Sequence, residues 1–141
     1  MRGFEPSLDL IKAFVKAADP ASALHLANKH DNLDIAALVM TDIAEAFALK
    51  KDTQGVQNVL ESLLVDDLRV RCLADLAGRL HAKDPEAATK YLAQAEKRLD
   101  GLNANPQRVQ AVQALARAYD VTNNAAAAAA LRKKHRQASH P

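Results

Sequence analysis

The sequence predicts an all-α fold of about eight helices arranged in four antiparallel pairs. Hydrophobic residues make up 49% of the 141 residues, much of that alanine, and only four glycines and five prolines interrupt them. Such a composition favours helix, since alanine has the highest intrinsic helix propensity. Apolar residues also recur three and four positions apart, which places them on one face of a helix. A third observation, an internal repeat, indicates how the helices pair.

Each predicted helix begins at a residue that suits a helix N-terminus. The first begins at Pro6–Ser7 and ends before Asp19, because a residue ahead of a proline is disfavoured in a helix. The third runs from about Leu33 to Lys50. The other starts have an Asp or Asn whose side chain can accept a backbone N–H of the first turn. These capping residues are Asp19, Asp52, Asp66 with Asp67, Asp84, Asn105 and Asn123.

The helices of the second half are bounded in the same way. The fifth helix is expected over Leu68–Ala82, and the sixth begins at Pro85. Gly101 is expected to end the sixth helix in the left-handed conformation that glycine adopts easily. The eighth helix follows Asn123, runs through six consecutive alanines and frays near Gln137. Because several turns are very short, the helices that flank them are expected to be antiparallel neighbours.

An internal repeat divides the chain into four units of two helices. Each copy has a Leu or Ile anchor, and the anchors lie 33, 33 and 39 residues apart. A bulky residue follows each anchor, then an Asp or Asn, then two small or apolar residues. The anchors are Leu10, Ile43, Leu76 and Leu115, and the bulky residues are Phe14, Phe47, Leu80 and Tyr119. The Asp or Asn residues are Asp19, Asp52, Asp84 and Asn123. The two small or apolar positions hold Ala23, Val56, Ala88 and Ala127, and then Ala27, Leu60, Leu92 and Leu131. This pattern predicts a helical repeat array in a single domain, 1–141, with repeats at about 6–32, 33–65, 66–104 and 105–137.

The stretch Leu76–Ala95, LAGRLHAKDPEAATKYLAQA, resembles the tetratricopeptide repeat family. It has the family's large–small pair and bulky residue in the first helix, with Ala77 and Ala88 where the two helices must touch, but one residue is deleted at the turn. The resemblance covers residues 6–136. It lacks the family's early Trp and most closing prolines, and Ile11 replaces the small residue of the first copy. It implies a right-handed α-solenoid whose first helices line a concave, peptide-binding groove; another helical solenoid or a helical bundle is the alternative.

The resemblance also implies which side chains face that groove. They are Lys12, Thr41, Glu45, Arg71, Gly78, His81, Gln110, Gln113 and Arg117. Gly78 is the most informative, because a glycine inside a helix costs about 1 kcal/mol relative to alanine and would leave the groove floor bare. The best-known groove of the family clamps a peptide's terminal carboxylate with basic and Asn residues. Asp42 and Asp75 stand at two corresponding positions here, so we do not expect that clamp.

The net charge of +2 is unevenly distributed. Residues 1–123 hold 15 basic and 17 acidic residues, whereas residues 124–141 hold four basic residues and no acid. This basic tail consists of Arg132, Lys133, Lys134 and Arg136. Such residues can bind phosphate backbones, so nucleic-acid binding is one alternative. No aromatic residues lie between them, however, and cations near a helix C-terminus also stabilise the helix dipole. We therefore expect a solubilising last helix, and not nucleic acid as the partner.

No residue pattern predicts catalysis, a cofactor or a metal site. The five histidines show neither the i,i+4 spacing nor the Cys/His spacing of a zinc site. There is no glycine-rich phosphate loop and no nucleophile with a base nearby in sequence. Cys72, the only cysteine, cannot form a disulfide within the chain and is expected to fill space in the core. The sequence therefore does not predict an enzyme.

The expected function is protein–protein interaction, in the form of a cytoplasmic scaffold, adaptor or small chaperone that binds a peptide or helix of another protein. A single cysteine fits a reducing compartment. No apolar run approaches the roughly 20 residues of a membrane span, so no membrane partner is expected. A homo-oligomerising structural domain is the first alternative, because the terminal repeats are not strongly polar and offer apolar surface to a second copy.

Overall fold

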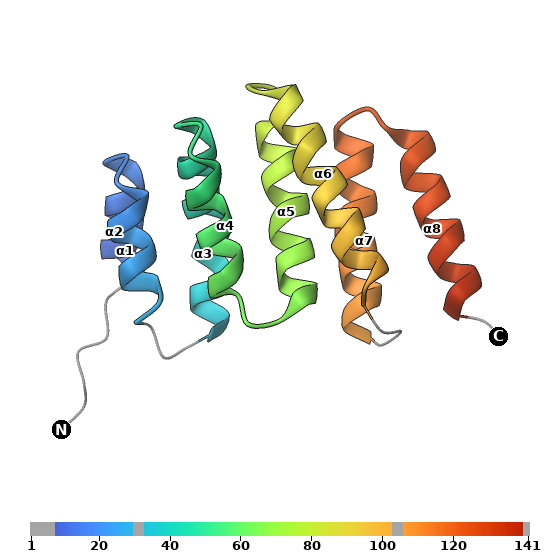
Figure 1. Ribbon diagram of the computed structural model, residues 1–141, viewed down its shortest axis with the longest axis horizontal. Helices are drawn as coiled ribbons and strands as arrows, with labels where there is room; N and C mark the ends of the chain where they lie inside the picture. Colours follow the sequence, from blue (N-terminus) through green and yellow to red (C-terminus); the bar gives the residue numbers. More distant parts are fainter. Residues whose placement is uncertain (1–7, 30–32, 103–105, 140–141) are drawn as a thin grey trace. The chain divides into compact units, whose positions relative to one another are not determined.

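The computed structural model describes residues 8–29, 33–102 and 106–139, with side chains for 8–29, 39–102 and 108–135. These residues form eight α-helices and no strand, which confirms the all-α class and the predicted number of helices. The predicted starts at Pro6–Ser7 and Asn105 lie outside the described residues. The helices are α1 (Leu8–Lys16), α2 (Pro20–Ala27), α3 (Leu33–Leu49), α4 (Thr53–Ser62), α5 (Asp66–Leu80), α6 (Pro85–Asp100), α7 (Pro106–Val121) and α8 (Ala125–Ser139) (Figure 1).

The chain divides into two compact units, and the N-terminal unit, Met1–Leu63, contains α1 to α4. Within it α2 packs against α1 and α3, and α3 also packs against α1 and α4. All four helices contribute fully buried side chains to the core: Ile11, Ala23, Val39, Ile43, Val56, Val59 and Leu60. The first copy of the repeat differs from the prediction, since its anchor Leu10 is 40% exposed and Ile11 is buried instead.

The C-terminal unit, Leu64–Pro141, contains α5 to α8. Here α5 packs against α6 and α7, and α7 also packs against α6 and α8. Its core is built from leucines of all four helices: Leu73, Leu76, Leu80, Leu92, Leu99, Leu115 and Leu131. Ala77 and Ala88 are both buried, as expected of small residues at the contact between α5 and α6, and Cys72 is buried as well.

Three of the predicted N-caps are confirmed. The carboxylates of Asp19, Asp52 and Asp84 each accept a hydrogen bond from the backbone N–H three residues later, and so satisfy one of the free donors of a first turn. These donors are Ser22 at 3.2 Å, Gly55 at 2.9 Å and Ala87 at 3.2 Å. The proline that follows Asp19 and Asp84 starts the helix without losing a backbone hydrogen bond.

Three of the four turns within the predicted repeats share one geometry. The bulky residue of the repeat offers its carbonyl to the N–H five positions later, and the residue before that N–H has a positive φ. The acceptor and donor pairs are Phe14 with Asp19 at 2.9 Å, Phe47 with Asp52 at 3.0 Å, and Tyr119 with Asn124 at 2.7 Å. The residues with positive φ are Ala18 at 59°, Lys51 at 62° and Asn123 at 63°. In the turn with the deleted residue, Asp84 instead donates to Leu80 four positions earlier, at 2.7 Å.

Two predicted caps and one helix end are wrong. Helix α5 begins at Asp66, and its N-cap is Val65, which has no side chain that can accept a hydrogen bond. Asp66 and Asp67 lie in the first turn, where negative charge favours the helix dipole. Asn123 takes the left-handed turn position, which asparagine tolerates, so Asn124 is the residue directly before α8.

The end of α6 also differs from the expectation. Gly101 is right-handed, with φ of −85°, and its N–H bonds to the Arg98 carbonyl at 3.1 Å. A tightened last turn therefore satisfies this carbonyl without the left-handed conformation that glycine allows.

Candidate functional site

The nine residues expected to face a groove are divided between the two units. Lys12, Thr41 and Glu45 lie in the N-terminal unit, and the other six lie in the C-terminal unit. Lys12 is exposed and Glu45 is partly exposed, but Thr41 is only 7% exposed. Thr41 therefore belongs to the interior of its unit.

Helices α5 and α7 lie alongside each other and run in the same direction (Figure 1). Near their N-terminal ends, Arg71 Nη1 donates a long hydrogen bond of 3.5 Å to Gln110 Oε1. Nearer their C-terminal ends, a Cβ placed on Gly78 would lie 3.4 Å from Val121 Cγ2. One contact joins residues near the N-terminal ends of the two helices and the other joins residues near their C-terminal ends, so the two helices are parallel.

We call the exposed strip along these two helices the α5–α7 surface. It includes five of the six predicted residues of this unit, together with Asp75, which stands at a position of the family's clamp, and Val121, which was not assigned to the groove. Its members are Arg71, Asp75, Gly78, Gln110, Gln113, Arg117 and Val121. All are exposed except Gly78, which is partly exposed. The sixth predicted residue, His81, is the C-cap of α5 and is partly exposed.

The charges on this surface are not balanced. Burial raises the pKa of the Asp75 carboxyl, and the positive charges of Arg79, Arg71 and Arg117 act against that rise. One carboxylate thus lies within the electrostatic reach of guanidinium groups from both helices. The sequence places Arg71, Asp75 and Arg79 at i,i+4 steps on one helix, whereas Arg117 is distant from them in the chain and was not expected to act on Asp75. The offset of 39 residues between the last two repeat anchors could have indicated this neighbour, because it makes Arg117 the equivalent of Gly78 in the preceding repeat.

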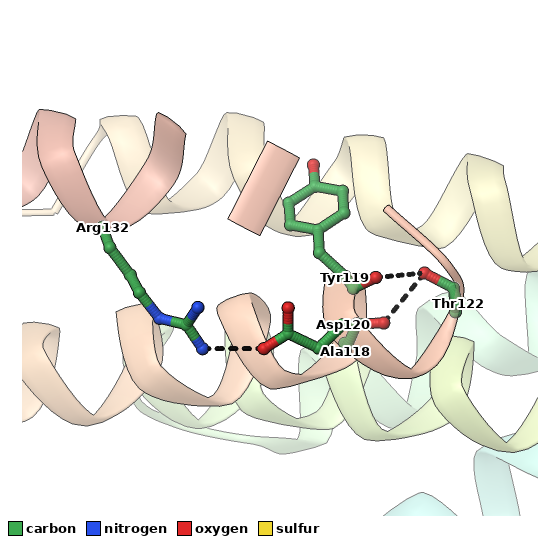
Figure 2. Close-up of polar contacts among 5 residues, drawn as sticks. All are labelled: Ala118, Tyr119, Asp120, Thr122 and Arg132. Atoms are coloured by element: carbon green, nitrogen blue, oxygen red, sulfur yellow. Dashed lines mark hydrogen bonds and ion pairs between the residues drawn. The ribbon is translucent and has the colours of Figure 1, made fainter. Parts of the chain in front are cut away.

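Two of the four basic residues of the tail form ion pairs within their own unit. Arg132 Nη2 donates to Asp120 Oδ2 at 2.8 Å, as Figure 2 shows, and Lys134 Nζ donates to Asp100 Oδ1 at 2.8 Å. Lys133 is exposed, and the side chain of Arg136 lies outside the described residues. Both ion pairs are exposed to solvent, which weakens them, but together they offset two of the tail's positive charges.

Polar contacts also tie the last three helices together. Tyr119 of α7 donates from its hydroxyl to Glu96 Oε2 of α6 at 2.7 Å, and burial together with this bond raises the tyrosine's pKa. Arg108 Nη2 of α7 lies 2.7 Å from His135 Nδ1 of α8. Burial, Arg108 and Lys134 all lower the pKa of His135, so its ring is neutral and Nδ1 can accept from Arg108.

The end of α7 satisfies its own carbonyls. Thr122 Oγ1 donates to the carbonyls of Ala118 at 2.8 Å and Tyr119 at 3.2 Å (Figure 2). Asn124 Nδ2 in turn donates to the Thr122 carbonyl at 3.1 Å and to its hydroxyl at 3.0 Å. These bonds hold the turn between α7 and α8 and have a structural role.

Two open hollows lie on the N-terminal unit, on either side of α2. One, of about 370 Å³, lies between α2 and α4, and the other, of about 380 Å³, lies between α1 and α2. Ala21 and His25 line both. The hollow between α2 and α4 has both His25 and Asp52 in its lining, and the Asp52 carboxylate accepts from the Gly55 N–H as the cap of α4.

Among the described side chains, in residues 8–29, 39–102 and 108–135, no three of His, Cys, Asp or Glu are grouped so that they could share a metal ion. Nor does any helix in residues 8–29, 33–102 and 106–139 have both the length and the apolar character to cross a membrane.

Comparison of the chain with protein-family models, with curated proteins and with solved structures finds no match. The resemblance to tetratricopeptide repeats therefore rests on the repeat pattern alone.

Proposed function

We propose that this protein is a protein-binding module, a scaffold, adaptor or small chaperone, which binds a peptide or helix of a partner protein. Within this proposal the four helix pairs form a right-handed solenoid of the tetratricopeptide type, and the α5–α7 surface is the part of the groove that the C-terminal unit supplies. A cytoplasmic location belongs to the same proposal and is supported by Cys72, a buried cysteine that forms no disulfide within the chain.

The observation that carries the proposal is the pairing of α5 with α7. Arg71 and Gln110, which are in contact, are 39 residues apart, as are the repeat anchors Leu76 and Leu115. Equivalent positions of successive predicted repeats therefore lie side by side, as stacking of the repeats requires. The anchors are buried and support the surface, while Gln113 and Arg117 remain exposed next to Arg71 and available to a ligand.

A pull-down from native lysate tests the proposal. The bait is the full chain, and the site variant replaces Arg71 and Arg117 by alanine. A matched control replaces Lys90 and Lys97 on α6, which are also exposed, and so removes the same charge elsewhere. We expect a discrete protein that binds the wild type and the control but not the site variant. Equal capture by all three baits would contradict the α5–α7 surface as the site.

The two alternative functions, homo-oligomerisation and nucleic-acid binding, are tested by different measurements. Sedimentation of the pure protein at several concentrations separates a homo-oligomer from a monomeric adaptor. Nucleic-acid binding through the tail is less supported, because Arg132 and Lys134 are already paired with Asp120 and Asp100. It predicts an affinity that falls steeply with salt and disappears when residues 131–141 are removed.

A further inference from the structure

We propose that the α5–α7 surface selects an acidic peptide segment, whose side-chain carboxylates bind Arg71 and Arg117 and whose adjacent apolar side chain covers Gly78 and Val121. This inference rests on the proposed protein-binding function and names the chemistry of the partner. It concerns carboxylates within the segment and does not require a chain terminus.

The charges of the surface provide the first argument. Arg71 and Arg117 come from different helices, both are exposed, and both act on the Asp75 carboxylate. Even if Arg79 is left out, the α5–α7 surface thus holds two guanidinium groups and one carboxylate. The remaining polar members, Gln110 and Gln113, are neutral and can donate hydrogen bonds to a carboxylate or to a peptide backbone. A partner with negative charge complements this strip, whereas a basic partner would face a net repulsion.

Asp75 is expected to determine how the acids of the partner are placed. Burial raises the pKa of its carboxyl even though Arg79, Arg71 and Arg117 favour the charged form. Because Asp75 is exposed on this surface, a second carboxylate directly above its own would be repelled. Acidic residues of the partner must lie to either side of Asp75, toward Arg71 and Arg117. Removing the charge of Asp75 should consequently strengthen the binding of an acidic segment.

Gly78 and Val121 provide the second argument. Val121 is 61% exposed, and Gly78 beside it carries no side chain that would shield it. The helix surface at Gly78 therefore remains open beside an exposed apolar side chain. A partner's Ala or Leu side chain would cover Val121 here and remove apolar area from water, which is favourable. An acidic segment with an adjacent apolar residue fits both parts of the surface.

Nucleic acid is the other class of negatively charged partner, and the surface fits it less well. Proteins that bind single strands usually stack the bases on exposed aromatic rings. Tyr91 and Tyr119 are 5% and 8% exposed, and the α5–α7 surface has no aromatic member. Asp75 would also repel a continuous phosphate backbone, whereas separated carboxylates can avoid it.

Fluorescence anisotropy with two matched probes tests the inference on the full chain. Both are short helical peptides with a Leu/Ala face; one has Glu residues beside that face, and the other has Gln at those positions. We expect the Glu peptide to bind at least about tenfold more tightly at low salt and to lose this advantage as salt is added. Arg71→Gln and Arg117→Gln should each weaken it about threefold to fivefold, and Asp75→Asn should tighten it. Lys90→Gln on α6 is the control and should have no effect.

Other outcomes would overturn the inference. One is equal binding of the Glu and Gln peptides; others are loss of affinity in Asp75→Asn, and loss of binding when the terminal carboxylate of the Glu peptide is amidated. An Arg71- and Arg117-dependent affinity for a single-stranded oligonucleotide that exceeds the affinity for the Glu peptide would favour the other partner class. Circular dichroism confirms that each variant is folded. If the pull-down still yields a partner that depends on Arg71 and Arg117 while the two peptides bind equally, the proposed function stands and only the acidic specificity falls.

Discussion

The ring of Phe47 in α3 occupies the space that a side chain at Gly55 in α4 would need. A Cβ built on Gly55 would overlap the ring, and Phe47 is only 6% exposed. Gly55 lies in the first turn of α4, where its backbone N–H donates to the capping carboxylate of Asp52 at 2.9 Å. The two contacts together bring the start of α4 directly against the end of α3.

This contact predicts opposite effects for the same substitution at two glycines. Gly55→Ala should lower the free energy of unfolding by up to about 2 kcal/mol, because overpacking costs about 1–3 kcal/mol and the gain in helix propensity is about 1 kcal/mol. Gly78→Ala should raise it by up to about 1 kcal/mol, since the added Cβ would make an ordinary contact of 3.4 Å with Val121. Urea denaturation of both variants measures the difference, and equal effects would contradict the role of Phe47.

The N-caps predict a second contrast, between two aspartates of the C-terminal unit. Asp84→Ala removes the bond to the Ala87 N–H and should cost about 1 kcal/mol of stability. Asp66→Ala removes the exposed ion pair with Arg69, 2.8 Å long, and one favourable negative charge of the first turn, and should cost less, about 0.5 kcal/mol. Thermal unfolding of the two variants is the measurement. A larger loss at Asp66 would mean that it caps α5 after all.

The turns predict a third pair of variants. Ala18 has φ of 59°, a conformation that costs a residue with a Cβ about 1–2 kcal/mol. Ala18→Gly should therefore stabilise the protein by about 0.5–1 kcal/mol after the entropy cost of glycine. Ala82 lies in the shortened turn and does not have a positive φ, so Ala82→Gly should destabilise. Chemical denaturation distinguishes the two, and stabilisation by both would show that the turns do not differ.

The pH dependence of stability should reveal His135. Its pKa in the folded chain is lowered by burial, by Arg108 of α7 and by Lys134 of its own helix, while Asp100 and Glu96 of α6 oppose the shift. As the pH drops below about 6.5, the unfolded chain binds a proton that the folded chain still excludes. Lowering the pH therefore lowers the free energy of unfolding until the lowered pKa of His135 is passed. Above about pH 6.5 the contribution of His135 to stability is fully present.

A single variant isolates this effect. His135→Asn keeps a neutral acceptor near Arg108 but does not titrate. Urea midpoints measured between about pH 7.5 and 5.5 should fall more steeply for the wild type than for the variant. Parallel pH profiles would show that His135 is protonated equally in the folded and unfolded chains.

Much of the fold follows from short-range patterns. Asp19, Asp52 and Asp84 could be predicted as caps because a cap is decided within a few residues. The same local rule failed at Asp66, where the extended conformation of Val65 lets the helix start without a side-chain cap. The local sequence is similar around an aspartate that caps a helix and around Asp66, which lies in the first turn. The conformation of the preceding residue determines which of the two positions the aspartate takes.

The surface and the tight contacts depend on residues that are distant in sequence or on exact ring positions. Arg117 reaches Asp75 only because α7 lies beside α5. Gly78 was expected to be the informative glycine, yet Gly55 has the closer neighbour, since the ring of Phe47 is placed by packing that no periodicity specifies. The identity of a partner is a further step, because it depends on a molecule that the sequence does not contain.

The turn residues also bear on how quickly the chain can fold. Asp19 and Asp52 each donate to the end of one helix and cap the start of the next, so closing each of these hairpins orders only a very short loop. The entropy cost of such a closure is small, and the contacts that follow are close in sequence. Low contact order of this kind is associated with folding in microseconds to milliseconds. A hairpin can therefore form before its neighbours and offer them a preformed surface on which to assemble.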